Sequence, residues 1–248
     1  MARTHCERCG QGLENQIAAL EDCPFCGVVF AKLARKHQPI PARRRLPPHT
    51  AQSPARPVSP WQRIFEQHRE TVQWWAKDRL FWPRLPVLIF MTYLGIRYLL
   101  NPEYRAIFDG INLGIHEAGH LVFKIFPTFI MFLGGTLLQL AAPILCGVLL
   151  FRQSDYFGTA FCGSWLGANF YNVAVYQADA QARLLPLVTV GGGVPMHDWY
   201  YMFSQMGILK LDGQIAFLTR AIAFTVIWAS VVYGGWVART IWLENKNP

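Results

Sequence analysis

The chain has 248 residues, of which 52% are hydrophobic and only 15% are charged. This balance excludes a disordered chain and argues against an ordinary soluble domain, and six Cys are too few for a small disulfide-built scaffold. Residues 1–84 hold 14 Lys and Arg against 7 Asp and Glu, whereas residues 85–248 hold 9 against 8. A basic block beside apolar segments is typical of the cytoplasmic side of a membrane protein, and nucleic-acid binding is the weaker interpretation. We therefore expect an integral membrane protein with its N-terminus in the cytoplasm and, because the first residues are polar, no signal peptide.

Residues 1–38 contain two Cys-x2-Cys pairs separated by thirteen residues, namely Cys6, Cys9, Cys23 and Cys26. Each pair presents two thiolates to one side, and two pairs complete a closed tetrahedral zinc site. We predict a zinc ribbon with one structural Zn2+, since four thiolates leave no open position for catalysis. Redox pairs or disulfides are the alternative, which a reducing cytoplasm disfavours. The ribbon would bind a cytoplasmic protein partner.

Two segments connect this ribbon to the apolar part of the chain. Residues 39–60 contain seven of the 16 Pro and a run of three Arg, and we interpret them as an extended linker that is solvated or binds anionic lipid headgroups. Residues 61–84 are predicted to form an amphipathic helix, which lies in the membrane interface or packs on the rest of the protein. Its apolar stripe consists of Trp61, Ile64, Phe65, His68, Val72 and Trp75.

Residues 85–248 form the predicted membrane-embedded domain. The apolar segments lie at about 85–100, 107–126, 128–151, 157–178 and 214–238. The third and fifth are long enough to span a bilayer outright. A stretch rich in Gly and Pro, from Leu184 to Pro195, is too broken for a span and is interpreted as a re-entrant or interfacial loop. We therefore predict an all-α integral membrane bundle of about four to six membrane helices in a lipid bilayer.

The clearest chemical motif is the pentapeptide from His116 to His120. Positions i and i+4 share one face of a helix, so both imidazoles can meet one metal ion. Zinc lowers the pKa of a bound water, and Glu117 would act as the general base. Two His and a Glu are costly in an apolar helix without a function, which disfavours a purely packed role. The small Gly119 would let another helix or a substrate backbone approach closely.

A third metal ligand must come from elsewhere in the chain. Residues 85–248 contain only three His, so a third imidazole can only be His197. Asp198 beside it would orient a ligand or bind the metal itself, and the alternative is that both residues cap or anchor a loop. Asp212 is a less favoured ligand, because Leu-Asp-Gly is a common turn sequence and Lys210 offers it an ion pair.

A polar stripe is predicted along the apolar segment 157–178. Its members recur at spacings of four, three, four and three, which places them on one helix face: Trp165, Asn169, Asn172, Tyr176 and Asp179. Asn169 and Asn172 would face a substrate strand or the metal shell. The slightly favoured alternative is that they join helices, assisted by Gly163 and Gly167 at GxxxG spacing.

With its His-Glu-x-x-His helix inside an apolar segment, followed by further apolar segments, the chain resembles the site-2 protease family of intramembrane zinc metalloproteases. The resemblance covers about residues 107–238, and the ribbon is not part of that family's shared core. It implies a bacterial cytoplasmic membrane and a third, aspartate ligand in a later helix, where Asp212 is the match. The Asn-Pro signature that precedes this aspartate in the family is missing here.

We therefore expect a membrane-embedded zinc metalloprotease with one catalytic and one structural Zn2+. Zinc-activated water and Glu117 would hydrolyse peptide bonds of membrane-associated polypeptides. One alternative is a non-catalytic metal-binding membrane scaffold or sensor whose ribbon binds a partner. Another is a zinc-dependent membrane hydrolase of a non-peptide substrate, because the motif specifies only activated water.

Overall fold

The computed structural model describes residues 59–187 and 196–246, together with residues 11 and 26. The predicted ribbon, nearly all of the predicted linker and most of the predicted loop between Leu184 and Pro195 therefore lie outside the described residues. The chain divides into two units, Met1–Pro57 and Val58–Pro248. The described residues of the second unit form helices and no strands, which confirms the predicted all-α class.

Seven α-helices and two short 3-10 helices follow one another in residues 59–187 and 196–246. They are α2 (Pro60–Ala76), α3 (Arg84–Leu100), α4 (Asp109–Val122), η1 (Phe123–Ile125), α5 (Thr128–Arg152), α6 (Tyr156–Ala178), α7 (Asp198–Gln205), η2 (Leu209–Leu211) and α8 (Asp212–Glu244). The predicted apolar segments correspond to α3, α4 with η1, α5, α6 and α8. The sequence did not predict α7, because eight residues are too short for a clear helical period.

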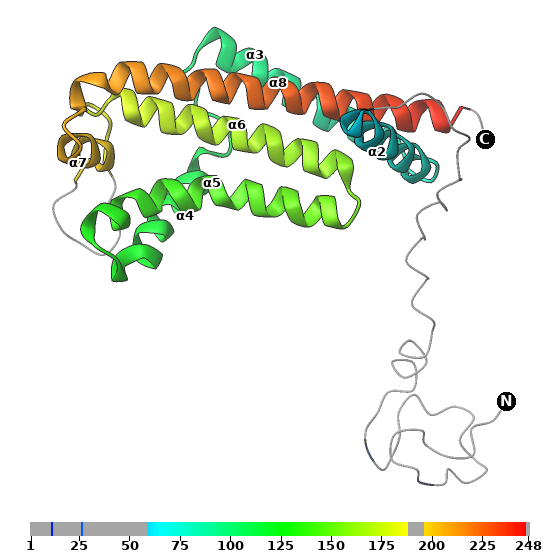
Figure 1. Cartoon of the computed structure of the whole chain (residues 1–248), viewed down its shortest axis with the longest axis horizontal. Helices are drawn as coiled ribbons and strands as arrows, with labels where there is room; N and C mark the ends of the chain where they lie inside the picture. Colours follow the sequence, from blue (N-terminus) through cyan, green and yellow to red (C-terminus); the bar gives the residue numbers. More distant parts are fainter. Residues whose placement is uncertain (1–10, 12–25, 27–58, 188–195, 247–248) are drawn as a thin grey trace. The chain divides into compact units, whose positions relative to one another are not determined.

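Helix α6 lies between α5 and α8, and α3 and α2 pack against α8 (Figure 1). The contact between α6 and α8 depends on small residues. A Cβ on Gly167 would lie 3.0 Å from the backbone nitrogen of Ile227 and 3.1 Å from the carbonyl oxygen of Ala223. A Cβ on Gly163 would lie 3.2 Å from the Cβ of Ser230 on α8, so both members of the predicted GxxxG pair let the two helices approach closely.

Two apolar clusters hold the helices together. The first joins α2 to the start of α6 and the end of α8, through Val72, Trp75, Ala76, Tyr156, Phe157, Val237, Ala238 and Ile241. The second joins α3, α6 and α8, through Leu94, Tyr98, Ala106, Ala168, Tyr171, Ala223 and Ile227. Burying these side chains is the main term that favours this packing.

Helix α2 uses only half of its apolar stripe for packing. Val72 and Trp75, near its C-terminal end, are buried against the bundle, whereas Trp61, Ile64 and Phe65 are exposed. The helix begins at a capping box, in which Ser59 and Gln62 each accept a hydrogen bond from the other's backbone N–H. It ends at Ala76, eight residues before the predicted boundary, because the chain must turn before the Pro83 that precedes α3.

Two helical segments in the described ranges are long and apolar enough to cross a membrane: α5 and the segment Leu209–Glu244, which comprises η2 and α8. Two is fewer than the four to six that the sequence predicts. Helix α4 has 14 residues and α3 has 17, whereas about 20 are needed to span the hydrocarbon core. Helix α6 has 23 residues but carries the polar stripe.

Candidate metal centre

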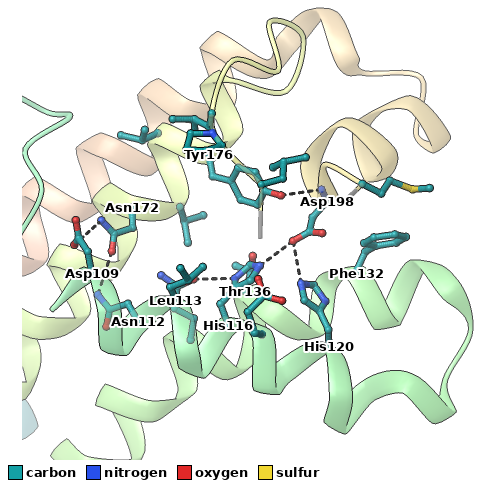
Figure 2. Close-up of a pocket in the computed structure, with 18 of the residues that line it drawn as sticks. Asp109, Asn112, Leu113, His116, His120, Phe132, Thr136, Asn172, Tyr176 and Asp198 are labelled. Atoms are coloured by element: carbon teal, nitrogen blue, oxygen red, sulfur yellow. Dashed lines mark hydrogen bonds and ion pairs between the residues drawn. The ribbon is translucent and has the colours of Figure 1, made fainter. Parts of the chain in front are cut away.

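Two histidines and one aspartate converge at one end of the bundle. His116 and His120 lie on successive turns of α4, and Asp198 is the first residue of α7. Asp198 Oδ2 is 2.8 Å from His116 Nε2 and 3.2 Å from His120 Nε2 (Figure 2). His116 and Asp198 are buried, and His120 is half-buried. The structure therefore brings the two predicted imidazoles to one face and adds a carboxylate from 82 residues away along the chain.

The other ring nitrogen of each histidine is held by α5. His116 Nδ1 donates to Gln139 Oε1 at 3.0 Å, and His120 Nδ1 donates to the carbonyl oxygen of Met131 at 2.9 Å. The carbonyl oxygen only accepts, and the Gln139 amide nitrogen is already donating to Asn169 at 3.0 Å. Both Nδ1 atoms therefore carry the proton, as is usual for metal-binding histidines.

With Nδ1 protonated, each neutral imidazole turns the lone pair of Nε2 towards Asp198. Two lone pairs and a carboxylate oxygen at one buried point are unfavourable unless a cation lies among them. Donor atoms around a tetrahedral zinc at about 2.1 Å are about 3.4 Å apart, which is close to the 3.2 Å between His120 Nε2 and Asp198 Oδ2 and longer than the 2.8 Å from the same oxygen to His116 Nε2. Two imidazoles and one carboxylate fit zinc, since calcium and magnesium prefer oxygen ligands.

The electrostatics keep the carboxylate ionised. Burial opposes the ionisation of Asp198, but a proton on Nε2 of His116 or His120, which would serve as such a cation, outweighs it and holds the pKa of this carboxyl below its ordinary value. Asp198 is therefore a carboxylate, the form that binds a metal.

Glycines on both helices allow α5 to pack directly on the site. A Cβ on Gly119 would lie 2.8 Å from the carbonyl carbon of Gly134, and a Cβ on Gly135 would lie 2.7 Å from Nε2 of both His116 and His120. Real Cβ atoms do not approach other atoms so closely, so only glycine fits. The close neighbour expected at Gly119 is thus another helix.

His197 takes a different role from its neighbour Asp198. Its Nδ1 accepts from the backbone N–H of Tyr200 at 3.2 Å, which caps α7, and its Nε2 lies 3.3 Å from Asp179 Oδ2. Asp179 also accepts from two backbone N–H groups just after α6. This arrangement fixes the start of α7 and so the position of Asp198. The capping interpretation therefore describes His197, while Asp198 joins the histidine pair.

Asp212, the third candidate ligand, is engaged elsewhere. Its Oδ1 accepts from Gln181 Nε2 at 2.8 Å, and its Oδ2 accepts from the Gln181 backbone N–H at 3.2 Å. These bonds tie the end of α6 to the start of α8. Among the described residues, the cluster that can hold a metal ion contains His116, His120 and Asp198, without Asp212.

The polar stripe of α6 faces the other elements of the site. Asn169 accepts from Gln139, Asn172 bonds to α4, and the Tyr176 hydroxyl accepts from the Asp198 backbone N–H at 3.1 Å. Asn172 lines the cavity described next, whereas Asn169 is fully buried behind Gln139. The stripe therefore both joins helices and borders the site.

A cavity of about 710 Å³ opens beside the cluster. Glu117 lines it together with both histidines and Asp198, so the predicted base and the candidate ligands face the same space. The hydroxyl of Thr136 is buried at the same wall and has no hydrogen-bond partner in the described part of the chain. Apolar residues complete the lining, including Leu113, Leu121, Phe132, Val173, Val175, Leu185, Leu187 and Met196.

The sequence did not identify the groups that hold the histidines. Gln139 was the detectable one, because a lone Gln in a strongly apolar helix needs a buried partner. The Met131 carbonyl has no sequence signal. Asn112 and Asp109, which also line the cavity, were not identified either. They lie four and seven residues before His116, a spacing that places all three on one helix face and could have indicated them.

No family model, curated protein or solved structure matches the chain. Function is therefore argued from the site, because a fold alone does not determine it.

Proposed function

We propose that the chain is a membrane-embedded zinc metalloprotease that cleaves membrane-associated polypeptides. One observation carries the proposal: the Nε2 atoms of His116 and His120 converge with Asp198 while both Nδ1 atoms are occupied. Three protein ligands leave a fourth position open, as in catalytic zinc sites. The cavity at this position has room for a substrate and contains Glu117.

Zinc bound at this cluster supplies a Lewis acid and lowers the pKa of a water molecule. Glu117 would accept the proton of that water and transfer it to the leaving amine. Its place supports this role, since it follows His116 on α4 and lines the cavity. Gln139 and the Met131 carbonyl would keep the imidazoles oriented throughout, because their bonds involve only the Nδ1 atoms.

The exposure of the apolar helices supports a location in the membrane. In the most apolar 18 residues of each candidate span, 33% of the residues are buried in α5 and 17% in the segment Leu209–Glu244. The core helix of a soluble protein is mostly buried, so these exposed surfaces favour an apolar environment such as a bilayer. Exposed apolar side chains on them include Leu137, Ile144, Leu145, Val148, Leu149, Phe217, Leu218, Ile222 and Val232. A bilayer in which the basic N-terminal segment stays cytoplasmic satisfies this requirement.

The test combines zinc content with cleavage. The full chain is purified in detergent, its zinc per chain is measured by mass spectrometry, and a peptide library is searched for cleavage products. His116→Ala should lose one zinc per chain. Glu117→Gln should keep its zinc but reduce cleavage by about a hundredfold or more, because the general base is removed. Glu70→Gln, exposed on α2 and outside the cavity lining, should leave both unchanged.

Two results would contradict the proposal. Undiminished cleavage by Glu117→Gln would exclude the assigned base, and undiminished zinc in a folded His116→Ala chain would exclude the metal site. A wild-type chain that holds the zinc but cleaves no peptide would favour the scaffold or the non-peptide hydrolase.

A further inference from the structure

A directed hydrogen-bond chain ends at the far end of the cavity. Trp165 Nε1 donates to Asn112 Oδ1 at 2.8 Å. Asn112 Nδ2 donates to Asn172 Oδ1 at 3.1 Å, and Asn172 Nδ2 donates to Asp109 Oδ1 at 3.3 Å (Figure 2). An indole N–H can only donate, so the direction of the whole chain is fixed. Its last member is a carboxylate, which can only accept.

The chain of bonds presents this carboxylate to the cavity. Asp109, Asn112 and Asn172 all line it, and Asp109 is half-buried. Burial raises the pKa of Asp109 above its ordinary value, although Arg105 acts in the opposite direction, and no ion pair joins Asp109 to Arg105 in the described part of the chain. Asp109 therefore keeps acceptor capacity for a group that enters the cavity.

The charges at this end favour a cation. Glu103 and Asp109 contribute two negative charges against one positive charge from Arg105, which leaves a net charge of −1. We propose that Asp109 forms a substrate subsite for one positively charged side chain, Lys or Arg, of the polypeptide. The inference rests on the proposed function, because it places the subsite on the same substrate as the metal site.

The spacing sets the position of this side chain. Asp109 precedes His116 by seven residues on α4, which is about 10 Å along a helix. An extended peptide covers about 10 Å in three residues. The basic residue would thus lie about three positions from the cleaved bond. Membrane polypeptides carry basic residues next to their spans, so they offer this feature.

Paired metal-binding probes test the subsite on the zinc-loaded full chain in detergent. Each probe is a tetrapeptide with a hydroxamate at its N- or C-terminal end and with Lys or neutral Nε-acetyl-lysine at the far position. The two series run from the metal in opposite chain directions, so only the one whose direction matches the substrate should show the preference. In that series, calorimetry should show that the Lys probe binds about tenfold or more tightly than the acetyl-lysine probe, the difference expected for one charge-assisted hydrogen bond. In Asp109→Asn the ratio should fall to about one, with the acetylated probe unaffected.

The controls separate the subsite from general attraction and from the metal site. Glu103→Gln should keep most of the preference, since Glu103 is exposed, screened by solvent and outside the hydrogen-bond chain; complete loss of the preference in this variant would overturn the subsite. A probe with Lys next to the hydroxamate should show no preference in the wild-type chain. Equal binding of the long Lys and acetyl-lysine probes would overturn the subsite while the metal site stands. Failure of every hydroxamate to bind would overturn the proposed function, and the subsite with it.

Discussion

Gln139→Leu is the sharpest test of how the site is built. Gln139 is buried on α5 and makes two hydrogen bonds at 3.0 Å, accepting from His116 Nδ1 and donating to Asn169 Oδ1. Leu has a similar volume, so the substitution removes both bonds with little change in packing. It leaves the His116 N–H and the Asn169 carbonyl buried without partners.

The expected magnitude follows from these two groups. An unsatisfied buried polar group costs about 1–3 kcal/mol, so the free energy of unfolding should fall by about 2–6 kcal/mol. Loss of the partner that orients a metal-binding histidine typically weakens metal affinity about 10–100-fold. Gln139→Glu is the matched control, because its carboxylate still accepts from His116. A turned Asn169 amide, whose Nδ2 has no partner among the described residues, would then donate to the new carboxylate.

Zinc affinity is measured by competition with a chelator, counting only the zinc that His116→Ala abolishes, and stability by thermal unfolding. Gln139→Leu should lose zinc affinity and unfold earlier, whereas Gln139→Glu should bind zinc within about threefold of the wild-type chain. Wild-type zinc affinity in a folded Gln139→Leu chain would refute the claim that Gln139 orients His116.

Two further predictions concern the third ligand and pH. Asp198→Asn should lose the zinc that His116→Ala abolishes, whereas Asp212→Asn should keep it and only lower the unfolding temperature; zinc counts that follow the opposite pattern would make Asp212 the ligand. Burial lowers the pKa of His68 below its ordinary value of 6.5, so its contribution to stability is complete above pH 6.5 and falls as the pH drops below it, because the unfolded chain then binds the proton more readily. The unfolding temperature of His68→Phe should therefore drop less than that of the wild-type chain between about pH 7.5 and about pH 5, and equal drops would show that His68 does not contribute.

The parts that sequence predicts well depend on local periodicity. The i, i+4 spacing of His116 and His120 defines a shared helix face wherever the helix lies, and the structure has both rings on one side of α4. The bounds of α3, α5 and α6 follow long apolar runs within about one residue of prediction. The third member of the cluster was not settled, because the contact between His116 and Asp198 depends on tertiary structure.

The structure of the short helix α7 was needed to decide whether His197 or Asp198 is the third candidate ligand. Adjacent residues at a helix start point in different directions, so one caps the backbone while the other projects into the site. The polar stripe on α6 was equally ambiguous. The sequence placed its residues on one helix face but did not show which side chains of other helices they contact. Asn169 turned out to support Gln139, whereas Asn172 borders the cavity.

Most of what helix α5 contributes to the site has no signal in the sequence. Between Met131 and Gln139 it supplies a backbone carbonyl to His120, two glycines that let it touch α4, and a side-chain acceptor to His116. Only the last of these involves a residue type that signals chemistry. The same helix is long and apolar enough to cross a membrane. The orientation of both imidazoles is therefore set by one membrane-length helix, through a backbone carbonyl for His120 and a side chain for His116, so substitutions that displace α5 should weaken metal binding without altering any ligand.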